Sequence, residues 1–236
     1  MNLRQIVGGV AMFAACSAPA AAFADLDQYF TPSTVSGALN VGDSNEVDWA
    51  QTFTVGVTGT LSGFDIWIER HSTVQLPLLF DIRTTSSGLP TLSDIGPHIL
   101  VAGEKAALEI PVDRGEFSLP SELVHFDLSS DPVPVTAGDV LAIVLRSDDP
   151  SGHPDGLTYS WFAASARGVN PFYSGGESYA LSGGHWFDLP AAGDAVFRTY
   201  VTPVPEPAAC CLLALGCGML GMARVPLFRP ARRQRV

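Results

Sequence analysis

An acidic loop between residues 148 and 156 is the clearest candidate for metal chemistry in this sequence. It places Asp148, Asp149 and Asp155 among glycine, proline and serine residues. Calcium accepts about six to eight oxygen ligands from flexible loops of this kind, and extracellular calcium sites are often weak. The spacing differs from that of an EF-hand. The loop is therefore a weak calcium candidate, with an ordinary solvated turn as the alternative, and we expect no other cofactor.

Exposed aromatic side chains are the second kind of residue that could bind a ligand. Sugar rings stack on such side chains, while neighbouring polar groups fix their orientation. We expect Trp67 on the outward face of its strand and the other candidates near loops. The alternative is that these rings close the core. The candidate glycan contacts are Trp67, Trp161, Tyr173, Tyr179 and Trp186.

No catalytic constellation stands out. The histidines show no metal-ligand spacing and no HExxH motif, and the chain has no G-x-S-x-G motif for a nucleophilic serine. Acidic residues are common enough for a carboxylate pair to arise by chance, so most are expected on a solvated outer face. We therefore name no catalytic residue and predict a non-enzymatic protein. The histidines considered are His71, His98, His125, His153 and His185.

Charge and cysteine content are distributed unevenly along the chain. The 236 residues include 24 acidic and 13 basic residues, and all acidic residues except Glu206 lie between residues 25 and 204. Such an acidic segment repels phosphate backbones, which argues against nucleic-acid binding. The four cysteines, Cys16, Cys210, Cys211 and Cys217, lie outside that segment. The segment therefore has no disulfide, CxxC zinc site or cysteine nucleophile of its own.

Residues 1–24 have the layout of a secretory signal peptide. A short basic start containing Arg4 precedes the apolar run 6–15, and Ala22 and Ala24 form a small-x-small cleavage site before Asp25. We expect export machinery and signal peptidase to handle this segment, with cleavage after Ala24. The alternative is a lipobox ending at Cys16, which would be acylated.

The last 34 residues form a second ordered series of signals. Residues 203–207 are proline-rich and predict an extended tether. Residues 208–223 carry no charge and predict a membrane-spanning helix of roughly 24 Å, at about 1.5 Å per residue. Residues 224–236 are basic, which places them in the cytoplasm and the body outside. The tail arginines are Arg224, Arg229, Arg232, Arg233 and Arg235.

This C-terminal series resembles the PEP-CTERM sorting signal of Gram-negative bacteria. The motif residues are Val204, Pro205, Glu206 and Pro207, followed by the apolar segment and the arginines in the required order. The resemblance implies handling by an exosortase, a membrane protease-transpeptidase, with cleavage close to the motif. It implies a protein anchored briefly in the inner membrane and then placed in the cell envelope or outside the cell. The alternative is a plain C-terminal anchor that is not cut.

Residues 25–202 predict one all-β domain, an antiparallel β-sandwich of jelly-roll type. Apolar residues alternate with polar residues around 64–68, 78–83, 124–128 and 197–201, as in strands with one buried face. Residues 140–145 are apolar on both faces, which is typical of a central strand. We expect turns at 56–59, 86–90, 137–139 and 182–184, and an irregular arm with a first strand between 25 and 45.

Three segments of the body, 51–64, 132–141 and 195–201, resemble extracellular β-sandwich modules that often precede such tails. Those modules are similar in outline to carbohydrate-binding sandwiches. Together the two resemblances imply an exported structural or adhesive protein associated with exopolysaccharide. The alternative is a carbohydrate-active enzyme or lectin-like protein carrying the same tail.

Overall fold

The computed structural model describes residues 23–32, 35, 37–42, 47–92, 97–113, 123–147, 159–164, 172–188 and 193–204. The chain divides into two compact units, Met1–Pro203 and Val204–Val236. Every strand and every hydrophobic cluster described here lies between Asp25 and Pro203. We therefore expect this body to fold without the segments on either side of it.

The described residues form fifteen strands and one short 3-10 helix, η1 (Ala107–Glu109). The strands are β1 (Asp25–Phe30), β2 (Gly37–Val41), β3 (Asp48–Thr54), β4 (Gly59–Ile66), β5 (Ile68–Arg70), β6 (Leu78–Ser86), β7 (Leu89–Pro90), β8 (Ile99–Lys105), β9 (Val124–Asp127), β10 (Val133–Val135), β11 (Val140–Arg146), β12 (Tyr159–Ala163), β13 (Ser178–Ser182), β14 (His185–Asp188) and β15 (Phe197–Pro203). Among the residues described, no helix is long and apolar enough to cross a membrane.

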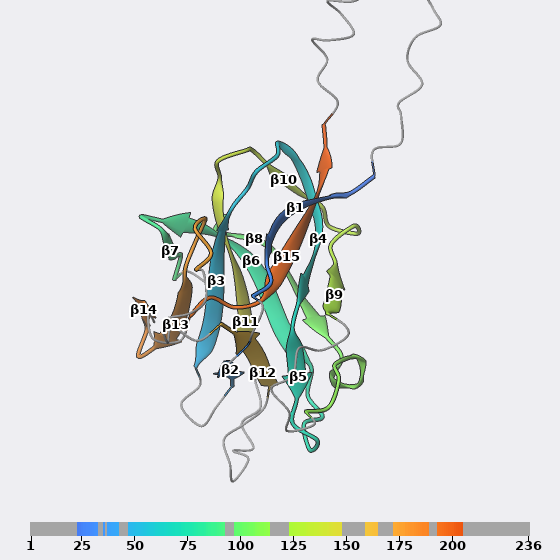
Figure 1. Ribbon diagram of the computed structural model, residues 1–236, viewed down its shortest axis with the longest axis vertical. Helices are drawn as coiled ribbons and strands as arrows, with labels where there is room; N and C mark the ends of the chain where they lie inside the picture. The colour runs from blue at the N-terminus through green and yellow to red at the C-terminus, as the bar shows by residue number, and fades with distance from the viewer. Residues whose placement is uncertain are drawn as a thin grey trace, which may run out of the picture. The chain divides into compact units, whose positions relative to one another are not determined.

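Two main sheets and a smaller one organise these strands (Figure 1). One main sheet has the order β1-β15-β4-β10, with β9 also paired to β4. The other has the order β14-β13-β3-β11-β6-β7, with β8 also paired to β6. The small sheet has the order β2-β12-β5. All ladders between these strands are antiparallel.

Aromatic contacts show that the two main sheets pack face to face. Phe64 of β4 lies edge-on to Phe80 of β6, with ring centroids 5.5 Å apart. Phe53 of β3 contacts Phe197 of β15 at 6.1 Å. These rings belong to one large buried cluster that draws on both sheets. The prediction of an all-β, antiparallel fold is confirmed, and the packing is consistent with a β-sandwich.

Period-two alternation predicted the inward faces correctly. The apolar sets of β4, β6, β9 and β15 are buried in the main cluster. Strand β11 pairs with β3 on one side and β6 on the other, so the predicted central strand is confirmed. The predicted turns at 86–90, 137–139 and 182–184 all contain residues with positive φ. Glycine accepts such angles without steric cost, as at Gly138, Gly183 and Gly184.

Two boundaries differ from the sequence prediction. The segment expected as an arm with one strand contains both β1 and β2, because β1 completes a sheet edge against β15 and β2 pairs with β12. Pro203, predicted to begin the tether, is instead the last residue of β15 and lies opposite Gly59 of β4. Proline is tolerated at a strand end because little of the ladder there depends on its missing N–H group.

Candidate functional site

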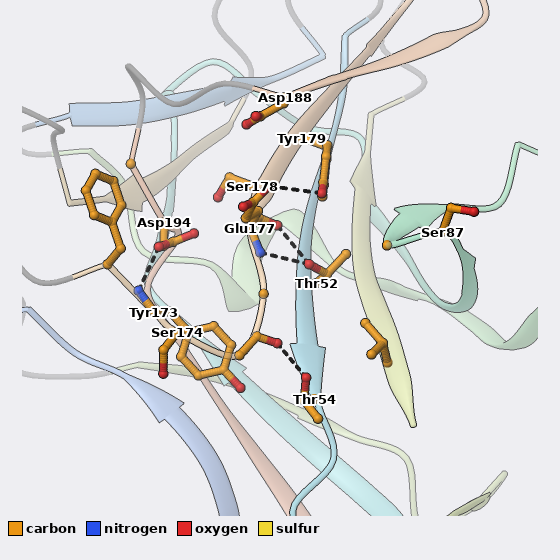
Figure 2. A pocket seen from close by; sticks show the side chains of 16 residues that line it. Thr52, Thr54, Ser87, Tyr173, Ser174, Glu177, Ser178, Tyr179, Asp188 and Asp194 are labelled. Atoms are coloured by element: carbon orange, nitrogen blue, oxygen red, sulfur yellow. Dashed lines mark hydrogen bonds between the residues drawn. The ribbon is translucent and has the colours of Figure 1, made fainter. Parts of the chain in front are cut away.

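A groove with a volume of about 650 Å³ runs over β3 and β13. Figure 2 shows hydroxyl groups from Thr52 and Thr54 on its floor, and carboxylates from Glu177, Asp188 and Asp194 along it. Most of the lining comes from β3, the segment 172–179 leading into β13, and residues 193–194 before β15. Ser87, Gly88, Val140 and Asp188 complete it. Pairing of β13 with β3 brings the first two parts together.

A buried polar network holds one wall of the groove in place. The Gln51 side-chain carbonyl accepts hydrogen bonds from the Ser178 hydroxyl at 2.6 Å and from the Ala195 backbone amide at 2.8 Å. Its amide group donates to the Thr52 carbonyl at 3.0 Å and to Asp194 Oδ1 at 3.4 Å. Gln51 is completely buried, so each of these bonds forms away from water. Such fully satisfied networks rigidify the site that they support.

The loop that precedes β13 lies tightly against β3. The Thr52 hydroxyl both donates to the Glu177 carbonyl and accepts from the Glu177 amide, at 3.1 and 2.8 Å. The Thr54 hydroxyl donates to the Gly175 carbonyl at 2.7 Å. A Cβ atom at Gly176 would lie only 2.0 Å from the Thr52 carbonyl oxygen, so only glycine fits there. This loop is thus fixed to the sheet by backbone contact.

Negative charge dominates the groove. None of the described residues that line it is basic. Asp194 is 4% exposed and accepts a hydrogen bond from the Tyr173 amide at 2.8 Å; burial raises the pKa of its carboxyl group. Burial, together with the nearby Glu177 carboxylate, raises the pKa of Tyr179 to about 12. The groove therefore favours neutral or cationic ligands over anions.

Two of the predicted aromatic contacts line this groove. Tyr173 lies in the loop before β13, where its ring packs edge-on against Phe197 at 5.0 Å and its hydroxyl donates to Gln28. Tyr179 is buried in β13, and its hydroxyl donates to Glu177 at 3.2 Å. Phe172 also lines the groove and is 60% exposed. Sequence analysis missed Phe172, although it stands beside Tyr173 in a segment with the glycine content of a loop.

The remaining aromatic candidates lie in packed positions. Trp67 lies on the face of its strand away from the main core, as predicted, but the expectation that it is exposed there is wrong: it is 2% exposed because its ring stacks on Phe162 at 4.5 Å in a second cluster. Trp161, expected near a loop surface, is fully buried and donates its indole N–H to the Val196 carbonyl. Trp186 is half-buried against the cluster that contains Tyr179.

A second cavity, called here the hollow, has a volume of about 540 Å³ and lies over β4, β9 and β15. In it, Asp65 joins two other side chains. Its Oδ1 atom pairs with His125 Nδ1 at 2.6 Å, and its Oδ2 atom accepts from the Tyr200 hydroxyl at 2.5 Å. Ala24 and Asp127 also line the hollow. His125, expected as a packed or surface residue, is a half-exposed partner of Asp65.

A third acidic position lies within the larger sheet. Asp81 is completely buried on β6, where Arg83 binds both of its oxygens at 2.5 and 3.0 Å. Arg146 of β11 approaches Asp81 Oδ2 at 3.1 Å. The expectation that acidic residues lie on a solvated outer face is therefore wrong for Asp65, Asp81 and Asp194, since loops and neighbouring strands cover that face.

Several predicted site residues lie outside the described residues. These are the calcium candidates Asp148, Asp149 and Asp155, the signal-peptide residues Cys16 and Ala22, the motif residues Pro205, Glu206 and Pro207, and the arginines of the tail. Ala24, Asp25 and Val204 are described and exposed. Within the described part of the chain, no three His, Cys, Asp or Glu side chains gather closely enough to hold a metal ion.

No family model matches this chain. No curated protein matches its sequence either. The function proposed for this chain therefore rests on the geometry of the site and on the sequence signals.

Proposed function

We propose that this chain is an exported bacterial surface or extracellular-matrix protein, sorted by a PEP-CTERM tail, whose body associates non-catalytically with exopolysaccharide. The observation that carries the binding part is the groove, which combines an exposed ring with hydroxyl and carboxylate groups. Sugars are bound in this way, through a ring face and a few polar groups that fix orientation. Export machinery, signal peptidase and an exosortase-type protease are the proposed partners, and the outer envelope or medium is the proposed destination.

The boundaries of the body support the sorting part of the proposal. Strand β1 begins at Asp25, the residue expected after signal-peptide cleavage. Strand β15 ends at Pro203, directly before the Val204–Pro207 motif. Removal of the flanking segments would thus leave every described strand intact. We also propose that the β-sandwich has a jelly-roll arrangement and that residues 208–223 form a transmembrane helix.

The groove has the properties that oligosaccharide binding requires. Phe172 offers an exposed ring, and Glu177 and Asp188 offer exposed carboxylates that accept hydrogen bonds from sugar hydroxyls. The buried Gln51 side chain holds the lining residues Ser178 and Asp194 in place, so little conformational entropy is lost on binding. A polymer of uronic acids is disfavoured, since three carboxylates line the groove without a compensating cation among the described lining residues.

A carbohydrate-active enzyme is the second candidate, and one observation favours it. The raised pKa of Asp194 is the property of a general acid, and other carboxylates lie in the same groove. Asp194 is, however, 4% exposed and bonded to the Tyr173 amide, which restricts its access to a scissile bond. New reducing ends released from bound oligosaccharides, and lost in Asp194→Asn, would establish the enzyme in place of the binding protein.

The sorting proposal is tested by intact mass of the protein recovered from its native host, with membrane and medium measured separately. A species that starts at Asp25 and ends near Pro205 is expected. A membrane-bound species still ending at Val236 would make the tail a simple anchor. A lipidated species starting at Cys16 would replace signal-peptidase cleavage after Ala24 with lipoprotein processing.

A further inference from the structure

The hollow contains the residue at which the signal peptide is proposed to end. Ala24 forms part of its wall, together with Asp65 and Asp127. The strand ladder fixes this position, because Asp25 lies opposite Val201 and Leu26 lies opposite Tyr200, another wall residue. The peptide nitrogen of Asp25 is bonded directly to the Ala24 carbonyl carbon. Cleavage of that bond therefore creates a free amine at the edge of an acidic cavity.

We propose that the hollow binds the α-ammonium group that signal-peptide removal creates on Asp25. The inference rests on the proposed cleavage after Ala24. Before cleavage, the Asp25 nitrogen belongs to a neutral peptide bond. After cleavage, it is a positively charged ammonium group. Binding of this ammonium group would fix the edge strand β1 in place, and only the processed chain could form the contact.

The charged groups around the new amine come from every strand beside it. Asp65 on β4 and Asp127 on β9 line the hollow and supply negative charge. On β1, Asp25 carries the new amine itself, and the Asp27 carboxylate accepts a hydrogen bond from the Gly56 amide instead. His125 bonds to Asp65, and the Tyr200 hydroxyl donates to the same carboxylate. Arg198 on β15 is the opposing cation. Two carboxylates and one imidazole thus line the hollow, with no lysine or arginine among its described lining residues, which favours an ammonium group.

Asp127 is the best residue with which to test this site. It is exposed on the outer face of β9, and the Ser129 amide donates to its Oδ1 atom at 2.8 Å. That bond lowers the pKa of Asp127, so its carboxylate is ionised at neutral pH. Its replacement by asparagine removes one charge without disturbing the core.

The test is NMR titration of the N-terminal amine in the body, residues 25–203, released from a fusion so that Asp25 is the first residue. An ordinary α-amine has a pKa of about 7.7–8.0. We expect a value at least about 0.5 units higher, which Asp127→Asn lowers and Asp131→Asn, an exposed control outside the hollow, leaves unchanged. The same body with its Asp25 amine acetylated lacks the cation and should have a lower Tm.

An ordinary pKa in the chain that starts at Asp25, or a raised pKa that Asp127→Asn does not alter, would overturn the docking of the amine. Neither result would test sorting or glycan binding, because the fusion, and not processing in the host, determines where this chain begins and ends. Conversely, a host protein whose mass excludes Asp25 as its first residue would overturn the cleavage proposal and leave the titration result standing.

Discussion

Two buried aspartates, Asp81 on β6 and Asp194 before β15, have opposite electrostatic surroundings. Asp81 is completely buried between Arg83 and Arg146, so its charge is compensated by cations. Asp194 is almost as buried, but its partners are a backbone amide and the Gln51 side chain. Burial raises the pKa of Asp194, as expected for a carboxyl group without a cation. The comparison shows that burial alone does not determine the pKa of a carboxyl group, which also depends on whether a cation lies beside it.

The largest effect is expected at the compensated aspartate. Asp81→Asn leaves the buried Arg83 guanidinium without its carboxylate, and breaking such a pair costs about 3–5 kcal/mol of unfolding free energy. Urea denaturation of the body measures this loss. The control Asp131→Asn, at an exposed position, should stay within about 0.5 kcal/mol of the wild type. A similar, small effect for both variants would mean that the Asp81 cluster does not support the fold.

A smaller loss is expected when the polar network beside the groove is broken. Gln51→Ala leaves the buried Ser178 hydroxyl and the Ala195 amide without one of their partners, at a cost of about 1–3 kcal/mol. Gln75→Ala, at an exposed glutamine, is the matched control and should be close to neutral. Equal stability of the two variants in denaturant would show that the groove wall does not depend on this network.

The smallest expected effect is on the pH dependence of folding stability, which should distinguish Asp194 from other acidic residues. Since its folded-state pKa is raised, its contribution to stability is fully present below the ordinary value of 3.8 and is lost as pH rises through the folded-state value. The stability of the wild type relative to Asp194→Asn should therefore fall from pH 3.5 to pH 7. Asp127, whose pKa is lowered, should give the opposite slope with Asp127→Asn. Parallel slopes in the two comparisons would contradict the assignment of Asp194 as uncompensated.

Sequence patterns predicted where the strands lie better than they predicted which strand faces are covered by other parts of the chain. Alternation assigned Phe64, Ile66 and Phe80 to an inward face, and the structure confirms this. The same alternation assigned Trp67 and Asp81 to the opposite face but could not tell that this face is also covered. A period of two residues indicates on which side of a strand a residue lies; coverage depends on elements distant in the sequence.

The groove could not be predicted for a related reason. Its floor residue Thr52 lies more than a hundred residues from Glu177 and Asp194, and strand pairing alone brings them together. Tyr173 and Tyr179 were found because aromatic residues near loops are reasonable sugar contacts. The pair Gly175 and Gly176 was the available signal for close packing, since Gly176 lies against Thr52 of β3 and Gly175 against the Tyr173 ring. The pair stands close to the missed Phe172 and the predicted Tyr173 in the sequence.

The most direct test of the account is calorimetric titration of the body, residues 25–203, with neutral β-glucan hexasaccharides, a chitosan hexamer and a galacturonic acid hexamer. Binding of a neutral or amino sugar is expected, with no binding of the acidic one. Phe172→Ala should weaken that binding about tenfold, which corresponds to about 1.4 kcal/mol. Phe187→Ala is the matched control, since this phenylalanine is 50% exposed, against 60% for Phe172, and does not line the groove. A folded body that binds none of these sugars, or that loses binding equally in both variants, would contradict the assignment of the groove as a glycan site.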